Sequence, residues 1–211
     1  FQIVANFSAH KHVRSEKDIY SIEALLRNNV LNTKKFLELL AEMPPDVYFC
    51  VSTDKAANPA NIMGASKRIM EDMIFSYSDK FPVKTARFAN VAFSNGSLLE
   101  GFLKRMEKKQ PISAPSDIKR YFVSLEESGQ LCLVACMLGN NREIVYPKLA
   151  SEQMISFDVI AENLIRESGF DLLYCKSEKE AIDSTEKIEK FNQYPVYFSV
   201  SDTSGEKKYE E

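Results

Sequence analysis

The sequence has 211 residues, enough for one domain with a substantial hydrophobic core or for one domain and a smaller second part. Hydrophobic residues make up 45% of the chain, an ordinary value for a globular protein. The net charge of −3 argues against a general nucleic-acid-binding protein, and no apolar run approaches the roughly 20 residues that a membrane-spanning helix needs.

The first half of the chain alternates between strand and helix patterns with short connections. This order predicts an α/β protein whose parallel sheet has right-handed crossovers. The expected elements are strands over residues 1–7, 47–51 and 83–89, each followed by a helix, over residues 18–42, 61–78 and 97–109.

After residue 110 the predicted elements become shorter and the regular alternation is lost. We therefore expect a boundary near residue 110 between a first part, 1–110, and a second part, 111–211, that ends in a charged segment. The second part is expected to contain helices over residues 125–138, 157–168 and 178–191 and strands over residues 143–146 and 195–200.

Four polar residues, Ser52 to Lys55, follow the apolar strand over residues 47–51. In open α/β sheets, ligands bind beyond the carboxyl ends of the strands, so this loop is a candidate site. Thr53, Asp54 and Lys55 supply a hydrogen-bond donor, an acid or base, and a cation. The alternative is a turn or helix cap, for which Thr and Asp are equally suited.

The helix expected over residues 61–78 carries Lys67 one turn after Met63 and on the same face. Gly64 and Ala65 lie between them and would let a ligand approach the helix closely. The alternative is a lysine that is simply solvated on the helix surface.

The other two strand ends also carry polar residues. His10, Lys11 and His12 follow the first strand, where a plain surface loop is the alternative. Asn90 follows the third strand, and residues 94–97 lead into a helix whose N-terminus would suit an anion such as a phosphate. A simple helix cap is the alternative there.

The four cysteines are expected to be buried and structural, which indicates a reducing compartment. Cys132 and Cys136 are close in sequence but lack nearby His or further Cys, so no metal site is expected. The other two cysteines are Cys50 and Cys175.

Residues 52–68, with the sequence STDKAANPANIMGASKR, resemble the signature of nucleotide-sugar 4,6-dehydratases. These enzymes belong to the extended short-chain dehydrogenase/reductase superfamily, and the most similar group is the UDP-N-acetylglucosamine 4,6-dehydratases of bacterial polysaccharide and nonulosonic acid biosynthesis. Further similar segments follow in the family's order: SAHKHV at 8–13, NNVLNT at 28–33, RFANV at 87–91, GS at 96–97, RYF at 120–122 and, more weakly, GEKKYEE at 205–211.

The resemblance implies a Rossmann-like parallel sheet, of which residues 1–110 would be a C-terminal portion with the NAD-binding and catalytic part. Residues 111–211 would form a small α+β substrate-binding part. The resemblance further implies NAD rather than NADP as cofactor, a UDP-sugar as substrate, a homo-oligomer and a cytoplasmic location. The family's Gly-rich phosphate loop is absent from the sequence, so we expect this polypeptide alone to bind NAD weakly or not at all.

Carried over by position, the resemblance gives the residues of the 52–68 segment separate roles. Thr53 would hydrogen-bond the sugar near C4, Asp54 would protonate the departing C6 hydroxyl, and Lys55 would remove the C5 proton. Lys67 would hold the nicotinamide ribose. Met63 stands where most of the superfamily has Tyr, and Met cannot act as an acid or base. Our hypothesis is that Asp54 accepts the proton of the C4 hydroxyl.

Other residues are implied to bind without taking part in the chemistry, with Asn29 supporting the geometry of the active-site helix. Competing interpretations are another nucleotide-sugar epimerase or reductase of the superfamily, or a truncated α/β module without catalytic activity. The expected cofactor-binding residues are Ser8, Ala9, His10, Asn29, Ser52, Lys67 and Asn90, and the expected substrate-binding residues are Lys11, His12, Asn90, Ser97 and Arg120.

Overall fold

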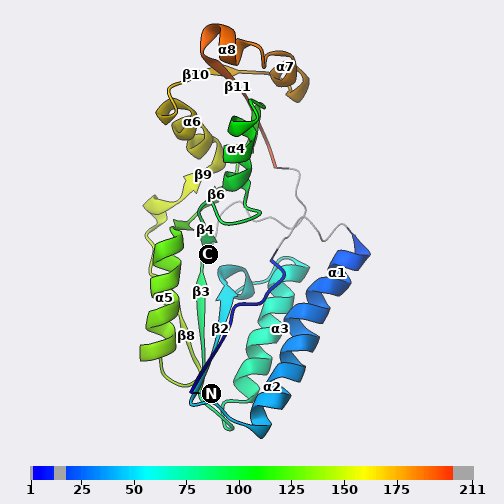
Figure 1. Ribbon diagram of the computed structural model, residues 1–211, viewed down its shortest axis with the longest axis vertical. Coiled ribbons are helices and arrows are strands. Elements are labelled where there is room, and N and C mark those ends of the chain that lie inside the picture. Colours follow the sequence, from blue (N-terminus) through cyan, green and yellow to red (C-terminus); the bar gives the residue numbers. More distant parts are fainter. Residues whose placement is uncertain (1, 12–17, 202–211) are drawn as a thin grey trace. The chain divides into compact units, whose positions relative to one another are not determined.

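The computed structural model describes residues 2–11 and 18–201, and its helices and strands are drawn in Figure 1. The described residues divide into two compact units, each made of separate segments of the chain. The division does not follow a single boundary near residue 110, because residues 90–110 belong to the second unit and residues 123–148 to the first. The first unit comprises 2–11, 18–89 and 123–148, and the second comprises 90–122 and 149–201.

The first unit is built on a four-stranded parallel sheet, which confirms the expected fold class. Asn6 pairs with Cys50, and Thr53 pairs with Phe88, so that the carboxyl ends of the first three strands lie at one edge. The strand order is β1 (Ile3–Asn6), β2 (Val47–Thr53), β3 (Val83–Phe88) and β8 (Glu143–Val145).

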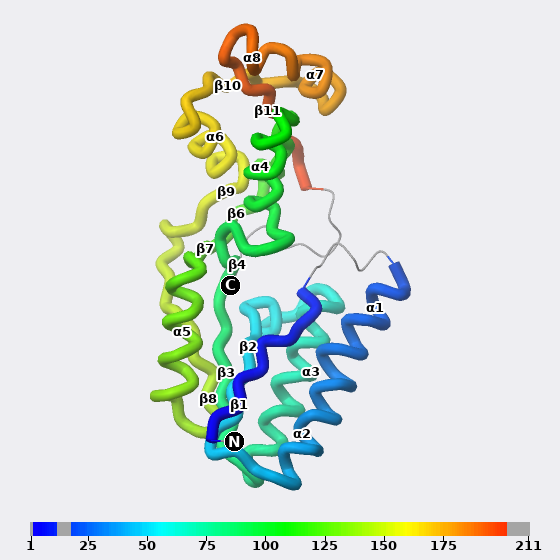
Figure 2. The backbone as a smooth tube through the Cα atoms, in the orientation of Figure 1, coloured from blue at the N-terminus to red at the C-terminus, as the bar shows by residue number. Residues whose placement is uncertain are grey.

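One face of this sheet is covered by the helices that follow β1 and β2. Their apolar residues Leu37, Leu40, Met70 and Ile74 pack with Tyr48 and with other residues of the same face. The expected helix over residues 18–42 is continuous, as Figure 2 shows, but it contains a π-helical segment that the sequence did not predict. The helices are α1 (Ile19–Leu26), the π-helix η2 (Arg27–Asn32), α2 (Thr33–Glu42) and α3 (Ile62–Ser76).

The opposite face of the sheet is covered by α5 (Leu125–Leu138), which begins with a capping box formed by Ser124 and Glu127. Cys132, Ala135 and Cys136 of this helix pack against Phe49 and against Ala86. Side chains alternate between the two faces of a strand, so Phe49 faces α5 while its neighbours Tyr48 and Cys50 face α2 and α3. Both faces are therefore covered, as a parallel sheet requires.

The second unit contains a smaller parallel sheet in the order β10 (Asp171–Tyr174), β11 (Gln193–Ser199) and β5 (Ile112–Pro115). Of these strands only β11 was predicted, from residue 195 on; β5 and β10 have four residues each, too few for a clear apolar pattern. Two short strand pairs complete the unit. The bounds are β4 (Asn90–Val91) paired with β7 (Phe122–Val123), β6 (Lys119–Arg120) paired with β9 (Ile155–Ser156), β5 (Ile112–Pro115), β10 (Asp171–Tyr174) and β11 (Gln193–Ser199).

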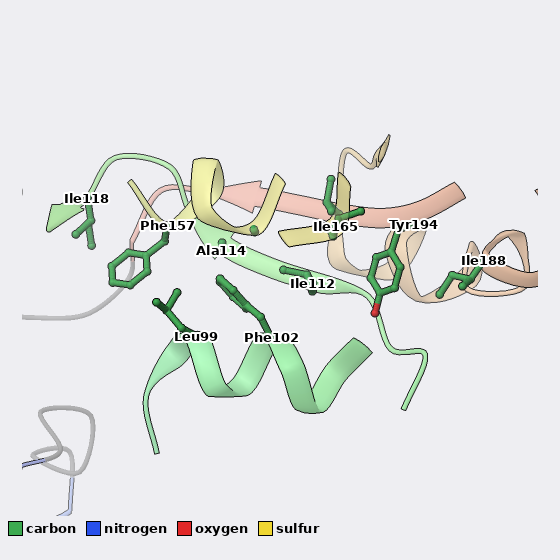
Figure 3. Packing of buried hydrophobic residues seen from close by; sticks show 11 residues of the cluster. Leu99, Phe102, Ile112, Ala114, Ile118, Phe157, Ile165, Ile188 and Tyr194 are labelled. Atoms are coloured by element: carbon green, nitrogen blue, oxygen red, sulfur yellow. The ribbon is translucent and has the colours of Figure 1, made fainter. Parts of the chain in front are cut away.

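Figure 3 shows the core of this unit, in which Leu99 and Phe102 point from α4 (Leu98–Glu107) towards Ile112 and Ala114 of β5. The expected single helix over residues 178–191 is wrong. It is interrupted at residues 184–186, where Ser and Thr favour turns over helix interior. The helices are α4 (Leu98–Glu107), the 3₁₀ turn η4 (Ser151–Gln153), α6 (Phe157–Glu167), α7 (Glu178–Asp183) and α8 (Lys187–Phe191).

The cysteines are free thiols, of which Cys50, Cys132 and Cys136 are buried and Cys175 is half-buried. The expected burial is thus confirmed for three of them. Among the residues that the structure describes, no helix has the length and apolar character that crossing a membrane requires. The described ranges also contain no group of three or more His, Cys, Asp or Glu residues placed to hold a metal ion.

Candidate active site

The loop after β2 places an acid directly beside a cation. It forms a short 3₁₀ helix, η3 (Asp54–Ala56). The Nζ of Lys55 lies 3.2 Å from Oδ1 of Asp54 and 3.4 Å from Oδ2, and the hydroxyl of Thr53 donates to Oδ1 at 2.7 Å. The hydroxyl of Thr53 also accepts the backbone N–H of Lys55, which confirms that Thr53 caps the short helix. Thr53 is thus both a helix cap and a member of the polar cluster.

This acid–cation pair is only partly withdrawn from solvent. The side chain of Lys55 is 26% exposed and that of Asp54 is 17% exposed. A molecule in solution can therefore reach both groups, while their partial burial makes the interaction between them stronger than it would be in water. Such a pair can give a proton at one atom and take a proton from a neighbouring atom.

Gly64 brings the first turn of α3 against the backbone of this loop. A Cβ atom at position 64 would lie 2.6 Å from the carbonyl oxygen of Lys55. The helix is capped by Asn61, whose side chain accepts the N–H of Gly64 at 2.8 Å. The sequence suggested that Gly64 makes room for a ligand; the structure shows that the carbonyl of Lys55 takes up this space.

Lys67 is buried, at 4% exposure, so the alternative of a solvated lysine is wrong. Its Nζ donates to the carbonyl oxygen of Val51 at 2.7 Å and lies 3.5 Å from Sδ of Met70. Burial lowers the pKa of Lys67, while Cys50 and Glu71 act in the opposite direction. The amine therefore faces the last residues of β2 from within the protein.

Asn29 links the loop after β1 to the first turn of α3. It is fully buried within the π-helix η2, a feature that often marks a functional site. Its Nδ2 donates at 3.0 Å to the carbonyl of His10 and to the hydroxyl of Ser66, and its Oδ1 accepts the N–H of His10 at 2.9 Å. The hydroxyl of Ser66 then donates to the carbonyl of Met63 at 2.8 Å. The side chain of Met63 is buried in this turn.

Ser52 is buried at the end of β2, and its hydroxyl has no hydrogen-bond partner among the described residues. A buried polar atom without a partner costs free energy, so this hydroxyl is suited to a ligand that supplies one. In the loop after β1, Ser8 bonds to the Asn6 side chain through both its N–H and its hydroxyl. Ala9 and Lys11 are exposed, and His12 lies outside the described residues.

The remaining predicted residues belong to the second unit. The hydroxyl of Ser97 caps α4 by accepting the N–H of Glu100 at 3.1 Å, which confirms the capping interpretation. Asn90 donates to the carbonyl of Tyr121 through both its backbone N–H and its side-chain amide. Arg120 is a buried cation, and its Nη1 donates to the carbonyl of Lys119 at 2.8 Å. Their contribution to substrate binding stays a prediction.

One buried ion pair was not predicted from the sequence. Arg87 at the end of β3 donates to both carboxylate oxygens of Glu71 on α3, with Nε 2.8 Å from Oε1. The side chain of Glu71 is 1% exposed and that of Arg87 is 14% exposed. The available signal was that Glu71 lies one helical turn after Lys67, on the face that packs against the sheet.

Comparison with known proteins gives the chain a family. Residues 1–190 match the family described as "Polysaccharide biosynthesis protein". The capsular polysaccharide biosynthesis protein CapD of Staphylococcus aureus is 35% identical over 170 residues, which cover 79% of this chain and 28% of CapD. A UDP-glucose 4-epimerase of Rickettsia rickettsii is 32% identical over 138 residues, which cover 62% of this chain and 40% of the epimerase.

The fold has a close match among solved structures. DesIV, a dTDP-glucose 4,6-dehydratase from Streptomyces venezuelae with NAD and TYD bound, superposes with a TM-score of 0.74 at 16% identity. The match covers 100% of this chain and 64% of DesIV, and the parallel sheet is Rossmann-like. The chain thus spans less than two thirds of the length of each of these three proteins. Because the family match extends over residues 1–190, the chain belongs to the polysaccharide biosynthesis protein family.

Proposed function

We propose that the protein is an NAD-dependent 4,6-dehydratase of a UDP-N-acetylhexosamine in bacterial surface polysaccharide or nonulosonic acid biosynthesis. The product would be a UDP-4-keto-6-deoxy sugar. The observation that carries this proposal is the contact between Asp54 and Lys55 at the end of β2. Loss of water across C5 and C6 needs one group to take the C5 proton and another to protonate the C6 hydroxyl, and adjacent acid and base groups meet that need.

Each residue of the loop then has a defined task. Thr53 holds the sugar near C4, and Asp54 takes the proton of the C4 hydroxyl as that carbon is oxidised, a task that Met63 cannot perform. Asp54 is thereby protonated and gives its proton to the departing C6 hydroxyl. Lys55 in its neutral form removes the C5 proton. The two side chains are in contact, so both proton transfers take place at one strand end.

The residues around this loop fit a nicotinamide cofactor. NAD, when bound, supplies the chemistry of accepting a hydride from C4 and returning it to C6. The buried hydroxyl of Ser52 offers an unused hydrogen-bonding group. Lys67 would hold the nicotinamide ribose, and Ser8, Ala9 and His10 would contribute from the loop after β1, which Asn29 links to α3.

Further residues would contact the substrate, as the resemblance implies. Lys11 and His12 are two of them. Asn90 would contact both the cofactor and the diphosphate of the substrate, and Ser97 and Arg120 would contact the substrate. We further propose a homo-oligomeric assembly.

The main alternative is a nucleotide-sugar 4-epimerase, which the similarity to the Rickettsia rickettsii enzyme favours. An epimerase of this superfamily does not need a base beside the acid, and it usually keeps the Tyr that Met63 replaces. Both features favour the dehydratase. A module without catalytic activity is the third candidate.

A product analysis separates the three functions. The full-length protein that contains these residues is incubated with UDP-N-acetylglucosamine and NAD, and the sugar nucleotide is analysed by mass spectrometry. A dehydratase gives a product that has lost one water and carries a keto group. An epimerase gives a product of unchanged mass, and a non-catalytic module leaves the substrate intact; either result contradicts the proposal.

A further inference from the structure

We propose that Glu71 and Arg87 act as a positioning pair that keeps the amine of Lys67 directed at the end of β2. This inference rests on the proposed function, in which Lys67 acts at the same strand end as Asp54. Neither Glu71 nor Arg87 is assigned a role by the resemblance to the dehydratases. Their geometry in the first unit carries the proposal.

The pair and Lys67 connect one turn of α3 to two neighbouring strands. Lys67 and Glu71 are four residues apart and lie on the same face of the helix. Lys67 bonds to the carbonyl of Val51 on β2, and Glu71 bonds to Arg87 on β3. In the sheet register Arg87 is the direct partner of Ser52, the residue after Val51. The two polar contacts that this turn of α3 makes therefore end at adjacent positions of the sheet.

Arg87 decides which partner Lys67 takes. A lysine four residues before a glutamate on a helix lies within reach of it, although the reverse order gives the stronger pair. Here the guanidinium of Arg87 engages both oxygens of the Glu71 carboxylate, the two-pronged geometry that arginine provides and lysine does not. The amine of Lys67 is left to the carbonyl of Val51, and this contact points it at the strand end from which Thr53 and Asp54 follow.

The charges around Lys67 agree with this geometry. Cys50 on β2 and Glu71 on α3 act electrostatically on the amine, and the pKa of the buried Cys50 thiol is itself raised by burial. Arg87 on β3 interacts with Glu71 first and then with Asp72 and Asp54. Because a neutral thiol carries no charge, Glu71 is the anion that balances Lys67, and Arg87 shares it.

Two substitutions are expected to move the pKa of Lys67 in opposite directions. Glu71→Gln keeps the size and a hydrogen-bond acceptor but removes the anion, so the pKa of Lys67 should fall. Arg87→Lys keeps the charge but offers no two-pronged contact. One oxygen of Glu71 then becomes available to Lys67, whose pKa should rise.

The titration is followed by NMR on the whole chain labelled with ¹³C at the lysine ε-carbons, with the signal of Lys67 assigned by Lys67→Arg. Glu38→Gln is the matched control, because Glu38 forms an exposed i,i+4 pair with Lys34 and should leave Lys67 unchanged. Glu71→Asp restores the anion and should bring the pKa of Lys67 back towards the wild-type value. A purely structural role would make the shorter Asp at least as disruptive as Gln.

Unchanged Lys67 titration in both variants, or shifts of the same sign, would overturn the positioning role. If Glu71→Gln or Arg87→Lys fails to fold, Glu71→Asp is used in its place. A folded Glu71→Asp chain in which the pKa of Lys67 is far from the wild-type value would also count against the positioning role. The titration needs no substrate, so it is independent of the proposed reaction. Opposite shifts in Lys67 together with a full-length protein that leaves UDP-N-acetylglucosamine unreacted would refute the dehydratase and support the pair.

Discussion

Two ion pairs near the end of the central strand differ in almost every physical respect. Asp54 and Lys55 are neighbours in sequence, their contact distance is 3.2 Å, and both are partly exposed. Glu71 and Arg87 are 16 residues apart and join a helix to a strand through two hydrogen bonds, and their side chains are 1% and 14% exposed. Each group of the first pair is more exposed than the group of like charge in the second, and the carboxylate of the second pair is enclosed by the fold.

The difference indicates a division of tasks. An acid and a base that are both partly exposed can exchange protons with a bound molecule, because such a molecule can reach both groups. A buried two-pronged pair has few alternative partners, so it fixes the elements that carry it. Changes in the first pair should therefore abolish chemistry and leave stability nearly unchanged, and changes in the second should act on stability and on Lys67.

The largest expected effect is on the accessible pair. Lys55→Met removes the proposed base and should lower the rate of 4-keto product formation by about 10²–10⁴-fold, the usual contribution of acid–base catalysis. Unfolding by urea should be little changed.

Asp54→Asn should abolish both oxidation at C4 and dehydration. Oxidation at C4 is measured as formation of reduced cofactor. Survival of C4 oxidation in Asp54→Asn would show that another group accepts the hydroxyl proton.

The next effect is on the buried pair. Arg87→Met leaves the carboxylate of Glu71 buried without its partner and should lower the free energy of unfolding by about 3–5 kcal/mol. Urea denaturation followed by circular dichroism measures this change. The control is Lys34→Met, which breaks an exposed pair with Glu38 and should cost about 0.5 kcal/mol or less. Equal losses in both variants would remove the distinction between the two kinds of pair.

A smaller effect is expected where α3 touches the loop of the accessible pair. Gly64→Ala places a Cβ 2.6 Å from the carbonyl oxygen of Lys55 and should destabilise the protein by about 1–3 kcal/mol. It should also lower activity by displacing Lys55. In Gly129→Ala, the matched control in α5, the Cβ meets nothing within 4 Å, so this variant should gain about 0.5–1 kcal/mol. A neutral Gly64→Ala would indicate that the contact relaxes freely.

The smallest effect is a dependence of stability on pH that Lys67 introduces. Burial lowers the pKa of Lys67 in the folded state, so the unfolded chain holds this proton to higher pH than the folded chain does. The contribution of Lys67 to the free energy of unfolding therefore rises with pH between its pKa in the folded chain and its pKa of about 10.4 in the unfolded chain. Lys67→Met lacks this dependence. Between neutral pH and about pH 9.5, the free energy of unfolding measured with urea should increase more for the wild type than for Lys67→Met. Equal changes in both proteins would contradict the assignment.

The sequence was sufficient to locate the accessible pair because local signals define it. An apolar strand stops at Val51, and the polar run that follows must lie at the carboxyl end of that strand. The helical period of residues 62–76 likewise places Lys67 on the face of Met63. These relationships depend on spacing along one element, which a sequence displays directly.

The buried pair and several short elements depend on contacts between distant segments. Glu71 and Arg87 lie on different elements, and although the helical period places Glu71 on the buried face of α3, it does not show which residue of another element pairs with it. The π-helix around Asn29 preserves the apolar period closely enough that an α-helix was expected. Strands β5 and β10 exist because β11 lies between them, and the sequence gives no sign of that pairing.

The most direct test of the acid–base assignment is a reaction of the full-length protein with UDP-N-acetylglucosamine and NAD in D₂O. The proton that Lys55 removes from C5 exchanges with solvent before a proton returns there. The account predicts a product that has lost one water and carries deuterium at C5, detected by mass spectrometry and NMR, and no such product from Lys55→Met. A product of unchanged mass, or one that retains the original hydrogen at C5, would contradict it.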